Sequence, residues 1–514
     1  DGSEKPGTHN LNSTNATLDM PLVFRDPLGF DMLTAQIAWS RSGTDTELRL
    51  NNISFANSHL AGTLFGNYRT APDSRGVIDL TGNLTRADAR FAGPYIPLVV
   101  GKATRDWLDT AFLAGQSNDV ALRVKGNLDD FPFPDNKGGV FQVVARITGG
   151  TLDYAESWPK IENIAGDLVF RGQRMEINAR QGTILGARLA KVRAEVPDLK
   201  HHDEILHVTG EAEGPTSEFL AFIEKSPVLG MIDRFTEGMR AQGGGKLALK
   251  LEIPLRARAR SRVAGTYQFI NNQIVADADL PPVEQVNGRL EFTESAVHVP
   301  NATGIFLGGP VSIAAATQRD AAVRLNLEGR VNIDNLRRSA GSPAWAHRLR
   351  GAADWRGTFV LRNKLADLAI ESNLQGIASD LPAPFVKTAA EAVPLRYERK
   401  FTGPQQDQVS FSYGEIVSAQ FARSIEGGRS LIRRGTLRFG GAAAEPQRDG
   451  VWVSGALKGF DLDRWLALIQ PGTGQLPLEV VGLDVRIGEF TALNRRFHEV
   501  ALSGTAQGGG WQST

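Results

Sequence analysis

Apolar and polar residues alternate in short runs along most of the chain, and many of these runs end in glycine, asparagine or aspartate. The segment 245–253 (GKLALKLEI) shows the pattern, with leucine or isoleucine at every second position and mostly charged residues between them. A period of two is typical of a β-strand that buries one face. Helical periodicity is confined to short stretches near 104–113, 217–224 and 461–469. The sequence therefore predicts a mainly β protein with a few short helices.

One part of the chain occurs twice. The segment PKIENIAGDLVF, which begins at Pro159, matches PPVEQVNGRLEF, which begins at Pro281, at an offset of 122 residues. The same offset aligns Gly182 with Gly304. Consecutive copies of one multi-strand unit build a sheet that grows lengthwise, and a large open sheet curls or splits. We therefore predict a long, repetitive, mostly antiparallel β-sheet that curls lengthwise into a U-shaped hydrophobic groove.

The length of 514 residues is enough for three or four domain-sized units. Because the repeat favours one continuous sheet, we expect segments of that sheet rather than separate domains. In order, the expected segments are a flexible polar start (1–20), a first β-groove segment with a short helix near 104–113 (21–135), repeat unit 1 (136–258), repeat unit 2 (259–345), and a C-terminal β-groove segment with a short helix near 461–469 (346–514).

The composition excludes several classes of function. The 57 basic residues balance the 57 acidic ones, so a general nucleic-acid binder is not expected. With no cysteine, the chain has no disulfide, thiolate zinc site or cysteine nucleophile. No apolar run is long enough to cross a bilayer. Because the sequence begins at Asp1 without a signal pattern, we expect a fragment of a longer protein.

Motifs that carry chemistry are almost absent. The Gly-Lys pairs at Gly101 and Gly245 lack the earlier glycine of a phosphate-binding loop. The acidic and histidine-rich run 201–204 could bind a metal, but a solvated turn after Pro197 is the favoured interpretation, because adjacent side chains on a strand point to opposite faces. We therefore predict no catalytic, cofactor-binding or metal-binding residue, no cofactor and no enzymatic activity.

A set of spaced motifs resembles a known family. Trp107-Leu108, the strand 120–125 and the segment 126–133 (GNLDDFPF) resemble the "WL … G-x-L-x-D-F-P-F" block of the YhdP family within the AsmA-like proteins. The segments 139–170 downstream and 51–57 upstream resemble the parts of that family that flank the block. The match is densest from about residue 20 to 320, and the set as a whole is more specific than any one motif.

This resemblance implies an envelope protein of bacteria with two membranes. Members of the family are implicated in moving phospholipid towards the outer membrane through a long periplasmic β-sheet that surrounds a hydrophobic groove. The resemblance therefore implies a periplasmic protein that is attached to the inner membrane through an N-terminal helix absent from this chain. Its expected partners are phospholipid and the membranes at the two ends of the full-length protein.

Alternating apolar residues are the candidates to line the groove and to shield acyl chains. These are Leu122, Val124, Val143, Ile147, Ile164, Leu168, Leu247, Leu249, Leu251, Val286, Leu290, Val323, Leu325 and Leu327. The same residues would equally pack the filled core of an extended structural or adhesive β-repeat protein. An enzyme that acts on envelope carbohydrate ranks third, because the eight histidines are scattered without evident partners.

Overall fold

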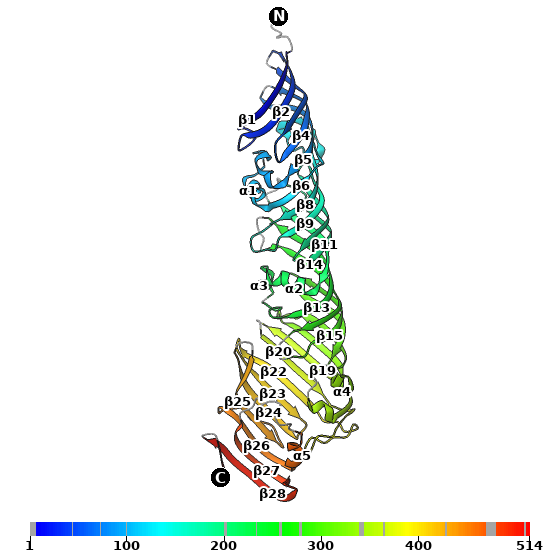
Figure 1. Cartoon of the computed structure of the whole chain (residues 1–514), viewed down its shortest axis with the longest axis vertical. Coiled ribbons are helices and arrows are strands. Elements are labelled where there is room, and N and C mark those ends of the chain that lie inside the picture. The colour runs from blue at the N-terminus through cyan, green and yellow to red at the C-terminus, as the bar shows by residue number, and fades with distance from the viewer. Residues whose placement is uncertain are drawn as a thin grey trace. The chain divides into compact units, whose positions relative to one another are not determined.

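Strands dominate the computed structural model of the chain (Figure 1). The structure describes all residues other than 1–6, 44, 72, 99, 200–202, 233, 256–259, 277–279, 339–343, 363–364, 427–428, 469–479, 508–509 and 514. In this described part, 29 strands belong to one mixed sheet and are joined by a few short helices. The prediction of a mainly β fold built from one long sheet is therefore confirmed.

Contacts between residues divide the chain into two units. Unit 1 comprises residues 1–231, 244–267 and 292–294, and unit 2 comprises residues 232–243, 268–291 and 295–514. The first fourteen strands are β1 (Gly7–Leu18), β2 (Leu28–Ser42), β3 (Asp45–Ala56), β4 (Leu60–Ala71), β5 (Ser74–Asp88), β6 (Phe112–Ser117), β7 (Val120–Asn127), β8 (Gly139–Leu152), β9 (Ile161–Arg171), β10 (Arg174–Ile184), β11 (Ala187–Val196), β12 (Ile205–Pro215), β13 (Arg240–Pro254) and β14 (Arg262–Val275).

The remaining strands begin with the second copy of the repeated segment. They are β15 (Val283–Thr293), β16 (Val297–Phe306), β17 (Gly309–Thr317), β18 (Val323–Asn332), β19 (Leu349–Arg362), β20 (Leu365–Ser372), β21 (Ile377–Ser379), β22 (Leu395–Gly403), β23 (Gln406–Tyr413), β24 (Val417–Glu426), β25 (Arg429–Phe439), β26 (Gly450–Asp461), β27 (Val480–Ala492), β28 (Arg495–Gln507) and β29 (Gly510–Ser513). The α-helices are α1 (Lys102–Ala111), α2 (Thr216–Glu224), α3 (Val228–Met231), α4 (Ile333–Arg338) and α5 (Leu462–Leu466).

Most strands pair antiparallel with the strand that precedes them in the chain. The short strands β6 and β7 lie end to end between β5 and β8, so β5 pairs with both of them. In unit 2, β21 occupies a similar position, because β19 pairs with both β20 and β21. Only the pairs β25–β26 and β26–β27 are parallel among the registers defined by the described residues.

The sequence repeat corresponds to a repeat of elements. β9 and β15 begin at Ile161 and Val283, which is the 122-residue offset of the sequence match, and β11 and β17 keep the same offset. In each copy four strands lead to a short helix, α2 after β12 and α4 after β18. The two copies are thus one supersecondary pattern used twice.

Two expectations differ from the structure. The start of the chain was predicted to be a flexible polar segment, but Gly7–Leu18 forms β1, because its backbone pairs with β2 along almost its whole length. The helix α4 was not predicted, since six residues are too few to show a helical period. The three predicted helices are present as α1, α2 and α5, with ends that differ from the predicted ones by at most three residues.

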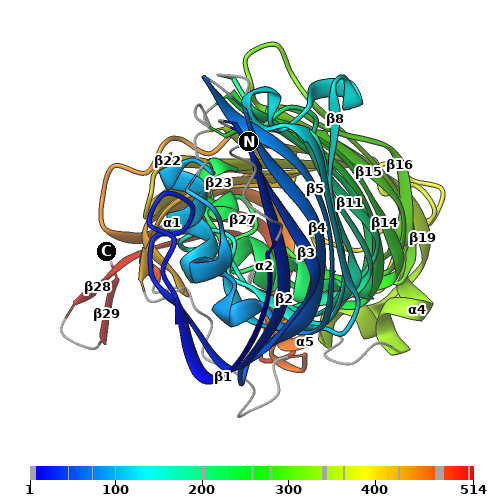
Figure 2. The ribbon, with the colours of Figure 1, turned by 90° about the horizontal axis from the view of Figure 1, so that it is seen from above.

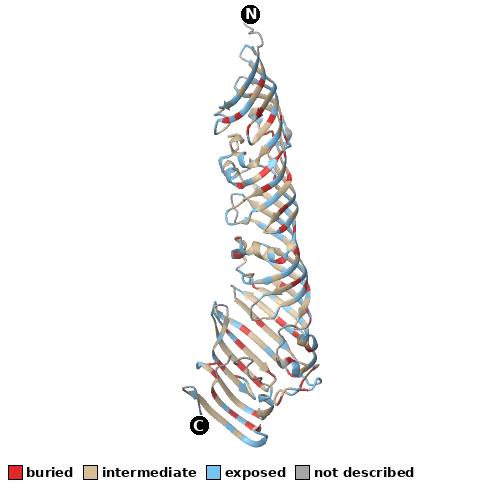
Figure 3. Cartoon of the chain, viewed as in Figure 1, coloured by how far each residue is buried: buried red, intermediate tan, exposed pale blue. Residues whose placement is uncertain are grey.

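Within unit 1 the strands bend around the helices. Figure 2 shows β2 to β5 and β11 curving past α1 and α2, which both lie on the concave side. Figure 3 shows that most strand residues are of intermediate exposure, with buried residues scattered among them. The strands of unit 1 therefore have a concave face on which the helices lie.

Candidate functional site

Strand register places the predicted apolar residues of β7 and β8 on one face of unit 1. Leu122 lies opposite Val143 on one side and Gly82 on the other. Val124 lies in the same way between Phe141 and Leu80. The alternate residues of β7 point to the other face, where Arg123 donates to Asp79 in an ion pair. Apolar and charged side chains are therefore separated by the sheet.

The same face continues through β9 and on to β13. Leu168 lies opposite Ala145, and Ile147 and Ile164 lie opposite Gly166 and Gly150. On β13, Leu247, Leu249 and Leu251 lie opposite the small or apolar residues Ala212, Gly210 and Val208, respectively. On the outer face of β11–β13, ion pairs join Arg188 to Glu213 and Lys246 to Glu213.

Unit 2 has an equivalent apolar face. Leu325 lies between Ala315 and Phe359, Leu327 between Ile313 and Gly357, and Val323 between Thr317 and Leu361. On β15, Val286 is buried, with 3% of its surface exposed, and Leu290 is half-buried.

The fourteen predicted residues are packed but not fully covered. Val286 is buried, and the other thirteen are of intermediate exposure. A filled sandwich core would cover such side chains with a second layer. The register therefore supports an apolar face in each unit that a second layer of the protein does not cover at these positions.

Buried clusters occur where connecting segments fold over the apolar face. In unit 1, Leu28, Phe30 and Phe55 are buried, and Phe24 and Tyr95 from two connections pack against them. In unit 2, the connection 373–394 supplies Val393 and Phe385 to a cluster with Tyr413 and Val417. The protein thus fills parts of the face with its own side chains.

In the described part of unit 1, the α-helices lie at one end of the strands. Register places the strand ends Asp88, Leu152 and Pro215 at the same edge of the sheet as Leu18. The connections that leave this edge contain α1, the segment 153–160, and α2 with α3. We call this edge the helix rim. The opposite edge, the turn rim, contains the tight turns after Ser42, Ala71 and Arg171 and the connection 128–138.

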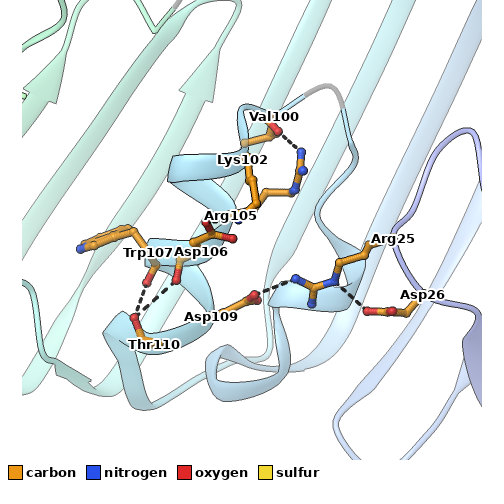
Figure 4. A network of polar contacts seen from close by, with 9 residues as sticks. All are labelled: Arg25, Asp26, Val100, Lys102, Arg105, Asp106, Trp107, Asp109 and Thr110. Atoms are coloured by element: carbon orange, nitrogen blue, oxygen red, sulfur yellow. Dashed lines mark hydrogen bonds and ion pairs between the residues drawn. The ribbon is translucent and has the colours of Figure 1, made fainter. Parts of the chain in front are cut away.

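A polar network fixes α1 at the helix rim (Figure 4). Arg25, from the β1–β2 connection, donates to Asp26 at 2.8 Å and to Asp109 of α1 at 2.9 Å. Both carboxylates raise the pKa of Arg25 above its usual range. At the start of the helix, Arg105 donates to the carbonyl oxygens of Leu98 and Val100.

Aromatic contacts continue from α1 to α2 along the same rim. Trp107 Nε1 donates to the carbonyl oxygen of Tyr154 at 3.1 Å, and the Tyr154 and Trp158 rings are 6.1 Å apart. Trp158 in turn lies 5.9 Å from Phe222 of α2. Burial, with a smaller contribution from Asp153, raises the pKa of Tyr154 to about 12. This tyrosine is therefore neutral at physiological pH.

Charged residues lie on the apolar face of unit 2, which the sequence analysis missed. Asp407, 1% exposed, accepts from Arg423 Nε at 2.8 Å and from Nη2 at 2.6 Å. Arg399, which is 2% exposed, lies on the same face, and its guanidinium is 5.3 Å from the centre of the Phe401 ring. The sequence did indicate the position of Asp407, because it lies two residues before Val409 on β23 and therefore points to the same face.

A second buried charge holds the connection 373–394 in place. Lys387 Nζ donates to the carbonyl oxygens of Leu374, Ile377 and Thr388 at 2.8–3.0 Å. Burial lowers the pKa of this lysine. Three carbonyl acceptors satisfy the donors of one ammonium group, so Lys387 stabilises the fold of this connection.

The described residues contain no group of histidine, aspartate and glutamate side chains arranged to hold a metal ion. His201 and His202 of the run 201–204 lie outside the described residues. Within the same limits, none of the helices is long and apolar enough to span a membrane.

The comparison with protein families shows the family to which the chain belongs. The family model described as YhdP protein matches residues 1–514. The chain belongs to the YhdP family. The resemblance found in the motifs is thereby confirmed, and it extends over the whole chain.

One curated relative of this YhdP-family chain is the intermembrane phospholipid transporter YhdP of Escherichia coli (strain K12). The two are 21% identical over an alignment of 491 residues, and the match covers 92% of this chain and 38% of the relative. The chain thus spans a little over a third of the relative's length. No solved structure matches it.

Proposed function

We propose that the apolar face of the sheet shields the acyl chains of phospholipids while they move between the inner and outer membranes. The observation that carries this proposal is the apolar register of half-buried residues within each unit, such as Leu122 and Leu249 in unit 1 and Leu325 in unit 2. In unit 1, charged residues such as Arg123 and Lys250 lie on the opposite face. The relative's description as an intermembrane phospholipid transporter supports the same function.

The energetics explain why such a face is needed. Burying one methylene group contributes about 0.8 kcal/mol, so exposing the 25 to 30 or so methylenes of two acyl chains to water costs on the order of 20 kcal/mol. A continuous apolar face replaces this barrier with small steps, because each advance exchanges one apolar contact for an equivalent one. The charged headgroup stays in water. No catalytic residue is needed, so we propose a conduit rather than an enzyme.

The location and partners follow from this role. We propose that the longer protein is periplasmic, is held in the inner membrane by an N-terminal helix, and meets a membrane at each end. The filled structural or adhesive repeat is less well supported, because the apolar side chains between the buried clusters are only half-buried.

Site-specific photo-crosslinking tests the proposal. A photoreactive residue at Leu249, on the apolar face, should capture phospholipid in the purified protein or in cells. The matched control is Lys250, the next residue on the same strand, which is exposed on the other face. Equal capture at both positions, or no phospholipid at either position and none extracted from the protein, would contradict the proposed function.

A further inference from the structure

The helix rim and the turn rim of unit 1 are built differently. The turn rim contains tight turns such as Arg171–Arg174. Exposed polar contacts, such as the hydrogen bond from Ser74 Oγ to Asp129, join neighbouring connections there. The helix rim instead contains α1, which lies in front of the strands on the concave side (Figure 4). The two edges of the apolar face therefore differ as routes for a ligand.

The helix α1 is not packed as a core element. Of its residues whose burial is described, Ala111 is fully buried, Arg105 and Leu108 are half-buried, and the others are exposed. A helix that carries a core would bury a wide apolar stripe. Moving α1 away from the sheet therefore exposes little apolar surface that is now covered.

The contacts that hold α1 are mostly polar, and they include the hydrogen bonds from Arg105 to the carbonyl oxygens of Leu98 and Val100 and a backbone hydrogen bond from Asp153 to Ala111 at the end of the helix. Arg25 and Asp109 form an ion pair whose side chains are 44% and 29% exposed. Trp107 contributes one hydrogen bond, to Tyr154, and its ring extends to the opposite side of α1 from Arg25 (Figure 4). Exposed ion pairs contribute little to stability. Segments with few buried apolar contacts need little free energy to open locally in the native state.

Exposed apolar side chains gather on the same rim. Leu22, next to the α1 network, is 94% exposed, and Met231 at the end of α3 is 71% exposed. On α1 and just after it, Trp107 and Leu113 are 38% and 40% exposed. On the turn rim, Leu199 and Leu255 are 37% and 40% exposed, as much as Trp107 and Leu113, so Leu22 and Met231 are what distinguish the helix rim. A ligand with acyl chains that approaches from the helix rim thus contacts apolar side chains before it reaches the concave face.

We propose that α1 is a lateral gate, and that phospholipid enters and leaves the apolar face of unit 1 past the helix rim, between α1 and the sheet. This inference rests on the proposed function and adds the route to it. The acyl chains pass Trp107 and Leu113 as α1 swings out, and the headgroup stays on the solvent side. The Arg25–Asp109 ion pair is the latch that returns α1 to the closed position.

Cross-linking tests the gate, and the chain is well suited to it because it contains no cysteine. The variant Arg25→Cys/Asp109→Cys, joined by a short bis-maleimide, fixes α1 to the β1–β2 connection. The matched control is Arg75→Cys/Asp129→Cys, which replaces an exposed ion pair of 3.9 Å on the turn rim. Each variant is compared with its own unlinked form, so the effects of the substitutions cancel.

The assay follows the transfer of pyrene-acyl phosphatidylglycerol into the 514-residue chain from vesicles of phosphatidylethanolamine and phosphatidylglycerol. Because a cross-link removes the open state altogether, we expect linkage across α1 to slow lipid entry by about tenfold or more, and linkage on the turn rim to change it by less than about twofold. Circular dichroism checks that both variants are folded.

The outcomes separate the gate from the proposed function. If lipid enters at the same rate with α1 linked, or if only the turn-rim linkage slows entry, the gate is wrong while the apolar face still binds lipid. If the unlinked folded protein takes up no lipid, both proposals are overturned. In an independent arm, Arg25→Ala should speed lipid entry by about twofold, since it removes one exposed ion pair. Slower entry in that variant would contradict the latch.

Discussion

A charge placed on the apolar face should stop lipid without unfolding the protein. Leu325 lies on β18 between Ala315 and Phe359, and it is half-buried. The substitution Leu325→Asp removes about half of the 1.5–3 kcal/mol that a fully buried leucine contributes, so we expect a loss of roughly 1 kcal/mol in the free energy of unfolding. That loss is small for a chain of this size.

The effect on lipid movement should be much larger. A carboxylate without a partner against acyl chains costs several kcal/mol, because it loses its hydration. Taking about 3 kcal/mol for a half-buried site, passage of lipid slows by about a hundredfold, since each 1.36 kcal/mol corresponds to a factor of ten. The assay is the rate of phospholipid transfer between donor and acceptor membranes in cells or vesicles that depend on the full-length protein.

The neighbouring residue provides the control. Asn326 follows Leu325 on the same strand, is exposed, and points to the other face. Asn326→Asp adds the same charge with almost no change of shape, and we expect transfer to stay within about twofold of the unmodified protein. If Leu325→Asp is folded and transfers lipid as fast as Asn326→Asp, acyl chains do not pass over Leu325.

Two further predictions concern stability. Replacing the buried Asp407 with asparagine leaves Arg423 without its bidentate carboxylate, and we expect the free energy of unfolding to fall by about 3–5 kcal/mol. Denaturant unfolding measures this loss, and the control is Asp354→Asn, which removes an exposed ion pair. If Asp407→Asn costs no more than Asp354→Asn, the Asp407–Arg423 pair is not a buried one. The raised pKa of Tyr154 means that the folded state keeps the phenol proton between pH 10 and about 12 while the unfolded state releases it. Stability present below pH 10 is therefore lost as the pH rises through this range, by up to about 3 kcal/mol, and Tyr154→Phe should flatten the dependence. An equally steep decline in that variant would show that Tyr154 is not the group responsible.

Local patterns in the sequence predicted much of the fold. Alternation places Leu247, Leu249 and Leu251 on one face, and the register of β12 and β13 shows this arrangement. The predicted helix at 217–224 is present because its apolar spacing is a property of a few neighbouring residues.

What the sequence could not predict depends on pairing over longer distances. The gathering of helices at one rim follows from which strand ends meet, and alternation within a strand carries no such information. The Arg25–Asp109 ion pair joins residues 84 positions apart. The buried pair of Asp407 and Arg423 was hidden for another reason, since charged residues are expected at the surface unless their partner is known.

The order of strands has a consequence for how the chain acquires its structure. Because β2 to β5 and β7 to β12 each pair with a strand close by in the chain, closing each hairpin fixes only a short loop. Most strands of unit 1 can therefore pair as soon as the following strand has been synthesised, because the partner of each strand is its neighbour in the chain.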